Sequence, residues 1–156
     1  MTVDYKGHFL LGDHRYCYPL TVVDHVSRYL LACDAFPSNE GPHTRRAFER
    51  IFREYGLPRA SLSDNGSPYT AKETRDFAAA LNLVPCFTPV RSPESNGMSE
   101  AFVKTFKRDY VRVNPLPDAL TTLRQIAGWF EDYNENHPHS GLRMRSPREF
   151  IRAQAQ

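Results

Sequence analysis

The chain has few cysteines and no long apolar run. Cys17, Cys33 and Cys86 are an odd number without a CxxC pair, which indicates neither a disulfide framework nor a zinc site. No segment approaches the roughly 18 apolar residues that a membrane span needs, and the first residues lack the basic and apolar regions of a signal peptide. We therefore expect a soluble, cytoplasmic protein whose cysteines pack as small apolar side chains on strands.

A strong excess of charge is also absent. The sequence holds 20 Lys and Arg against 18 Asp and Glu, a formal net charge of +2, which alone favours no class of partner. The basic residues are nevertheless grouped in two short segments. They are Lys104, Lys107, Arg108 and Arg112, and then Arg143, Arg145, Arg148 and Arg152. Such clusters are typical of phosphate binding, although a solvated helix face is the commoner explanation for any one of them.

The length of 156 residues allows one sizeable core but not two ordinary domains, so we expect residues 1–156 to form a single domain. Residues 16–36 are rich in β-branched and aromatic side chains and are interrupted by "DHVS". This pattern predicts two strands joined by a tight turn. The shorter apolar stretch at residues 2–9 predicts a further strand, so the first third is expected to be antiparallel β.

The remainder alternates helices and strands. Apolar residues at helical spacing predict helices over 43–56, 70–82 (with Thr70 as N-cap), 115–137 and 146–154. The long helix is expected to pack through one stripe, which is Leu120, Leu123, Ala127 and Phe130. Short strands are expected before "DNG" and at "LVPCFTP", the latter buried. This order predicts a mixed sheet covered by helices, an α/β or α+β layered domain.

Three acidic residues lie where these elements meet polar loops. Asp4 is on the first strand, Asp64 opens "DNG", and Glu100 begins the amphipathic part of "SPESNGMSEAFVKTFKRDYV". Each has an ordinary alternative, because Asp-Asn-Gly is a common turn and a first-turn acid is favourable beside a helix dipole. Side chains at the strand ends of such a sheet can nevertheless converge on one crevice.

Clustered carboxylates without histidine or cysteine ligands suit magnesium, because a hard cation prefers oxygen. Two such ions can activate an attacking hydroxyl and stabilise a leaving oxygen in phosphoryl transfer. Lys104 and Lys107 lie four and seven residues after Glu100, so a helix would present all three on one face. The alternative, a Glu-Lys pair at i,i+4, explains Lys104 and leaves Lys107 unused.

Three ordered blocks resemble the catalytic core of the retroviral-integrase superfamily (DDE type), and within it the transposases of bacterial insertion sequences. They are "LSDNGSPY", "SPESNGMSEAFVKTFKRDYV" and "YNENHPHSGLRMRSPREF". The family carries Asp, Asp and Glu with 35 residues between the second and third acids, and 35 residues also separate Asp64 from Glu100. The resemblance covers nearly the whole chain. It implies a ribonuclease-H-like fold, a five-stranded mixed sheet with its first three strands antiparallel and helices on both faces.

The resemblance also implies roles for individual residues. Asp4, Asp64 and Glu100 correspond to the three catalytic, metal-binding acids. The implied DNA-binding residues are Lys104, Lys107, Arg108, Asn65 and Asn96. Asp13 and Asp24 are rivals for the first acid, because the family usually has a tryptophan a few residues before it and this chain has none there. Both rivals have simpler explanations as loop and turn residues.

The implied activity is Mg²⁺-dependent phosphodiester cleavage and strand transfer during DNA transposition. Two Mg²⁺ ions, for which Mn²⁺ can substitute, would act with DNA bound. The implied partners are transposon ends, target DNA and further copies of the chain, with the protein at the bacterial nucleoid when bound. Alternatives are a nuclease of the same fold and an inactive DNA-binding remnant. Because this chain lacks the upstream helix-turn-helix region of the family, it is expected to be the core of a longer transposase or a truncated copy.

Overall fold

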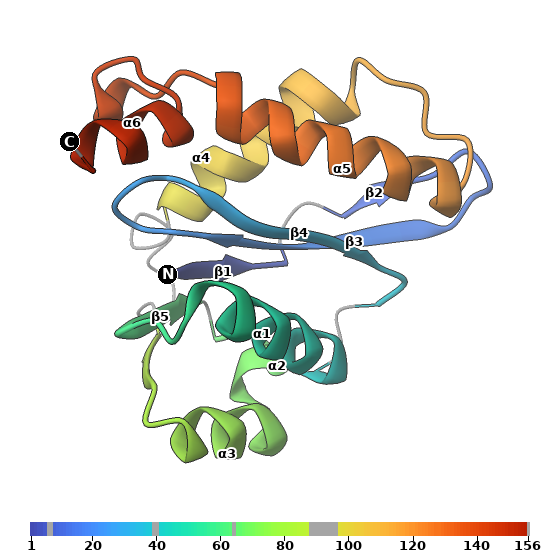
Figure 1. Ribbon diagram of the computed structural model, residues 1–156. Coiled ribbons are helices and arrows are strands. Elements are labelled where there is room, and N and C mark those ends of the chain that lie inside the picture. Colours follow the sequence, from blue (N-terminus) through green and yellow to red (C-terminus); the bar gives the residue numbers. More distant parts are fainter. Residues whose placement is uncertain (6–7, 39–40, 64, 88–96, 156) are drawn as a thin grey trace.

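The computed structural model describes residues 1–5, 8–38, 41–63, 65–87 and 97–155. A mixed sheet forms the middle layer, and helices cover both of its faces (Figure 1). The strands are β1 (Thr2–Asp4), β2 (Phe9–Leu10), β3 (Tyr16–Val23), β4 (Leu30–Phe36), β5 (Ala60–Ser63) and β6 (Val84–Phe87). The helices are α1 (Gly41–Tyr55), α2 (Ser67–Thr70), α3 (Lys72–Ala80), α4 (Gly97–Phe106), α5 (Ala119–Asn136) and α6 (Pro147–Gln154). The predicted ribonuclease-H-like α/β architecture is confirmed.

Pairing between strands confirms the predicted topology and corrects the strand count. Strand β3 pairs antiparallel with both β1 and β4, while β1, β5 and β6 are parallel neighbours. The described part of the chain has six strands rather than five, because the segment predicted as one strand at residues 2–9 forms two. Strand β1 pairs with the last residues of β3, and β2 pairs with its first ones.

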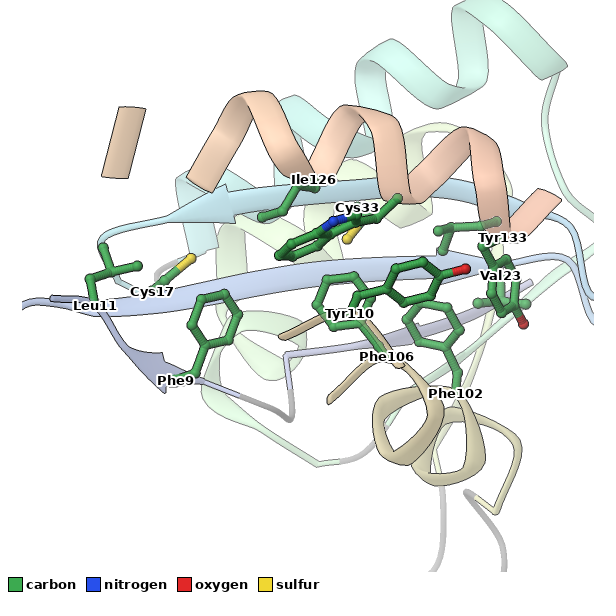
Figure 2. Packing of buried hydrophobic residues seen from close by; sticks show 12 residues of the cluster. Phe9, Leu11, Cys17, Val23, Cys33, Phe102, Phe106, Tyr110, Ile126 and Tyr133 are labelled. Atoms are coloured by element: carbon green, nitrogen blue, oxygen red, sulfur yellow. The ribbon is translucent and has the colours of Figure 1, made fainter. Parts of the chain in front are cut away.

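Two apolar clusters lie on opposite faces of the sheet, because successive residues of a strand point to opposite faces. Val3, Leu20 and Val22 pack with Ile51 of α1 on one face. Cys17 and Val23 belong to the other face, which α4 and α5 cover. Figure 2 shows the aromatic rings of this second cluster gathered between those helices and the sheet. The central strands are therefore buried on both sides.

Helix α4 is anchored by aromatic side chains at four-residue spacing. Phe102 and Phe106 have ring centroids 5.8 Å apart, and Phe102 meets Tyr133 of α5 edge-on at 5.0 Å. The helix continues into a π-helical segment, η2 (Lys107–Val111), in which the Arg112 N–H donates to the Lys107 carbonyl at 3.0 Å. Such segments widen the helix locally and occur often at functional sites.

The prediction of which side of the long helix α5 is buried is wrong. Leu120 is 61% exposed and Leu123 is 45% exposed, whereas Ile126, Trp129 and Tyr133 of α5 enter the core. Both stripes are apolar, and the second carries the larger rings, which bury more area. No helix in the described part of the chain is long and apolar enough to cross a membrane.

Smaller expectations are also corrected. Strand β6 is exposed at all four residues, Cys86 among them, because it lies at the edge of the sheet and pairs only with β5 among the described strands. Thr70 is not an N-cap. It ends the short helix α2, where its hydroxyl donates to the Gly66 carbonyl at 3.2 Å. Pro68 near the start of α2 favours this separate turn, and α3 begins after Ala71.

Candidate metal site and basic helix

Asp4 ends the central strand β1 and is 1% exposed. Its Cα partner across the antiparallel pair is Thr21, whose hydroxyl donates to the Asp4 carbonyl at 3.2 Å. Val3 faces α1, so alternation along the strand places the neighbouring Asp4 on the opposite face. That is the face covered by α4 and α5.

Glu100 lies in the first turn of α4 and is half-buried. Helix α4 packs directly on β1, so the helix that carries Glu100 contacts the strand that carries Asp4. Phe102 and Phe106 fix the rotation of α4, because both rings are buried in the core. The structure therefore brings the elements of these two predicted acids together on one face of the sheet.

Two of the predicted site residues, Asp64 and Asn96, lie outside the described residues. The parallel register pairs Thr2 of β1 with Leu62 of β5, and β5 ends at Ser63. Asn65 is exposed just before α2. The described residues contain no cluster of three metal-type ligands, a set that does not include Asp64. The three-acid site therefore stays a prediction.

The rival acids hold turns together. The Asp24 carboxylate accepts hydrogen bonds from the Val26 and Ser27 N–H groups at 3.2 and 2.8 Å, and from the Ser27 hydroxyl at 2.8 Å. Burial alone would raise the pKa of Asp24, but these hydrogen bonds outweigh it and lower the pKa. Asp13 forms an ion pair with Arg15 at 3.3 Å. These contacts give both rivals structural explanations.

The residues of the first basic group differ in their contacts, and the difference begins between Lys107 and Arg108 in η2. Lys104 is exposed and Lys107 half-buried, and neither forms an ion pair with another described residue. Arg108 instead holds Asp109 through two hydrogen bonds, of 2.5 and 2.7 Å. These bonds from Arg108 lower the pKa of Asp109. Arg108 is therefore engaged by a neighbouring carboxylate, whereas the two lysines are in no ion pair among the described residues.

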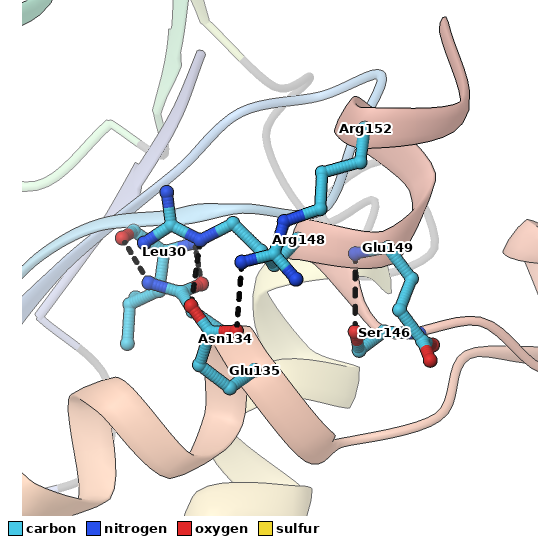
Figure 3. A network of polar contacts seen from close by, with 7 residues as sticks. All are labelled: Leu30, Asn134, Glu135, Ser146, Arg148, Glu149 and Arg152. Carbon is cyan, nitrogen blue, oxygen red and sulfur yellow. Dashed lines mark hydrogen bonds and ion pairs between the residues drawn. The ribbon is translucent and has the colours of Figure 1, made fainter.

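The second basic group also divides. Arg148 pairs with Glu135 at 2.7 Å and lies over the Tyr29 ring at 4.9 Å, and Arg152 reaches the same carboxylate at 3.6 Å. These contacts dock α6 on α5 (Figure 3). Ser146, where this helix was predicted to start, is the N-cap of α6 and forms a capping box with Glu149. Arg143 and Arg145 are exposed and make no ion pair within the described part of the chain.

Asn134 has a structural role that the sequence did not reveal. It is fully buried; its Nδ2 donates to the Leu30 carbonyl at 3.0 Å, and its Oδ1 accepts from the Leu30 N–H at 2.8 Å (Figure 3). Strand β4 pairs only with β3 among the described strands, so this amide takes the place of a missing neighbour. Its one sequence signal was its position in the block "YNENHPHSG".

The same block supplies three packed rings. His137 stacks on Tyr133 at 5.2 Å, and His139 lies edge-on to both rings at 5.2 and 5.0 Å. Burial lowers the pKa of both histidines, that of His139 to about 4. Both imidazoles are therefore neutral near pH 7.

Comparison with sequence families gives two consistent matches. The model of the integrase core domain matches residues 1–93, and a second model of the same description matches residues 83–147. An insertion element IS136 uncharacterized protein of Agrobacterium fabrum is 67% identical over 111 residues, which are 70% of this chain and 57% of the relative. The transposase InsD for insertion elements IS2A/D/F/H/I/K of Escherichia coli is 60% identical over 94 residues, 60% of this chain and 31% of the relative.

Solved structures agree on the fold. The HTLV-2 integrase catalytic core domain in complex with magnesium superposes with a TM-score of 0.76 and 14% identity, over 96% of this chain and 93% of that one. A chain of the simian T-cell lymphotropic virus intasome superposes with a TM-score of 0.79 and 16% identity, over 96% of this chain and 52% of that one. At these identities the likeness shows the fold alone. Since the first family model covers more than half of the sequence, the chain belongs to the integrase core domain family, next to the transposases of bacterial insertion elements.

Proposed function

We propose that the chain is the catalytic core of a DNA transposase, which cleaves phosphodiester bonds and transfers strands with Mg²⁺. The observation that carries the proposal is the contact between β1, which ends in the buried Asp4, and α4, which holds Glu100. The chain spans 57% of the IS136 relative, so activity and partners of the whole protein are part of the proposal.

The donor set fits a hard divalent cation. Asp4, Glu100 and Asp64 offer carboxylate oxygens alone, which Mg²⁺ and Mn²⁺ prefer. These three residues would hold two ions when DNA is bound, and the ions would supply charge stabilisation for the attacking and leaving oxygens. The protein's own part is to fix these oxygens, since β1 is a central strand and α4 is locked by its rings.

The lysines of α4 would hold the DNA backbone beside the acids. Lys104 and Lys107 follow Glu100 by one and two helical turns, and both lack ion pairs within the described residues. Transposon ends and target DNA are the proposed partners, bound by more than one copy of the chain. The dimeric and trimeric forms of the HTLV-2 core support such assembly. The bacterial relatives favour action on cytoplasmic, nucleoid DNA.

A branched DNA whose free 3′-hydroxyl lies against the branch-point phosphodiester tests the reaction. We expect the chain to join the two strands with Mg²⁺ or Mn²⁺, because strand transfer is reversible and this substrate needs no transposon-end sequence. Denaturing gels separate joined from cut products. Cutting without joining would identify a nuclease of the same fold. DNA binding with neither product would identify an inactive remnant.

Replacing Lys104 and Lys107 together by Ala should weaken binding to all DNA sequences alike. Each lost phosphate contact lowers the slope of log affinity against log salt by roughly 0.9, so a decrease of about 1.8 is expected. Fluorescence anisotropy at several salt concentrations measures it. The matched control is Arg46→Ala with Arg53→Ala, two exposed residues of α1 on the other face of the sheet. If both double variants had the same slope of log affinity against log salt, the two lysines would be ordinary solvated residues without a phosphate contact.

A further inference from the structure

A cavity of about 560 Å³ lies beside α4, between that helix, the turn joining β3 to β4, and residues 137–141. One wall is formed by Gly97, Ala101 and Thr105, which recur every four residues and so line one side of α4. Because these side chains are small, they leave room next to the helix backbone. Glu100 directly precedes Ala101 in the sequence, and Lys104 directly precedes Thr105. The side of α4 that carries Glu100 and Lys104 is therefore adjacent to this wall.

Arg28 closes the cavity from the hairpin turn. Its φ of 61° is in the left-handed region, where glycine or asparagine is the easier choice at the end of a hairpin loop. The guanidinium donates to the His25 carbonyl, and Nη2 lies 3.9 Å from the position that a Cβ on Gly141 would occupy. The guanidinium therefore lies in the lining of the cavity, beside Gly141.

The far wall is made of rings. Tyr133, His137 and His139 all line the cavity and contact one another. The Nε2 atom of His139 is buried and has no hydrogen-bond partner in the described part of the chain. Because this atom is not open to the cavity, a ligand would meet the half-buried rings of His137 and His139 rather than Nε2.

We propose that this cavity binds one unstacked nucleotide of a DNA strand, with the base against the His137 and His139 rings and its phosphate at Arg28. The inference rests on the proposed function and adds a ligand site to it. The volume suits a single small molecule, whereas a duplex is too wide to enter. A single-stranded nucleotide can stack on rings without regard to sequence. Lys104 on the adjacent side of α4 would guide the strand toward the cavity.

The test compares a blunt duplex with the same duplex carrying a short single-stranded overhang that contains 2-aminopurine. Ala101→Leu fills the cavity from α4, and Arg28→Gly removes the guanidinium while relieving the strained φ. Each is expected to lower affinity for the overhang duplex roughly tenfold, with blunt-duplex affinity unchanged. The overhang's fluorescence change should disappear as well. Ala79→Leu, at an exposed position of α3, is the matched control and should behave as wild type.

The outcomes separate this inference from the proposed function. If the wild-type chain binds neither duplex, both fail together. If it binds the two duplexes equally, or if both cavity variants keep the preference for the overhang, the nucleotide site is wrong and the DNA-binding proposal stands. Melting curves confirm folding, and Arg28→Gly is expected to melt no lower than wild type because its backbone strain is removed.

Discussion

Asp64→Asn and Glu100→Gln are each expected to lower Mg²⁺-dependent cleavage and joining by roughly a thousandfold. A neutral amide keeps the size of the side chain but removes the charge that holds the cations, and about 4 kcal/mol of lost transition-state stabilisation corresponds to that factor. The branched substrate with Mg²⁺ or Mn²⁺ provides the measurement. Neither substitution should lower thermal stability without metal, because the two clusters of the core are built from hydrophobic side chains.

Asp4→Asn belongs to the same experiment and identifies the first acid. We expect it to abolish activity, whereas Asp13→Asn, which weakens only a turn and its pair with Arg15, should keep it. Asp24→Asn should cost stability rather than catalysis, because Asp24 holds the hairpin turn. Full activity of a folded Asp64→Asn or Glu100→Gln chain would remove that residue from the site. Loss of activity with Asp13→Asn and retention of activity with Asp4→Asn would identify Asp13, not Asp4, as the first acid.

The order of the elements followed from sequence because strand periodicity and turn residues are local. The hairpin at residues 16–36 is such a case, and β3 and β4 occupy it. Which helix stripe enters the core is decided by tertiary packing instead. Helix α5 offers Leu120 and Leu123 on one side and Trp129 and Tyr133 on another, and the pattern of apolar residues alone does not choose between them.

Site prediction divided in a similar way. The resemblance named Asp4 and Glu100, and the helix α4 that carries Glu100 packs on the strand β1 that carries Asp4. Hydrophobic patterning predicts apolar contacts, so it could not find Asn134, a polar residue whose partners lie 104 positions away. It could not find the cavity either, because Arg28 and His139 come together only through the fold.

Asn134→Ala is expected to destabilise the chain by about 3 kcal/mol. The substitution removes both hydrogen bonds to Leu30 and leaves its N–H and carbonyl buried without partners, which costs about 1 to 3 kcal/mol for each group. Urea denaturation at constant pH and without metal measures the change in the free energy of unfolding. Asn134→Asp should be at least as harmful, because a carboxylate cannot donate to the Leu30 carbonyl and would be buried.

Asn136→Ala is the matched control on the same helix. The Asn136 amide donates to Asp132 at 3.0 Å and is exposed, so its removal should change stability by no more than about 0.5 kcal/mol. An equal, small effect of Asn134→Ala would mean that water replaces the amide at β4. A large effect would show that one side chain of α5 holds the edge of the sheet. Because α5 also carries Tyr133, the same loss should loosen the ring wall beside α4.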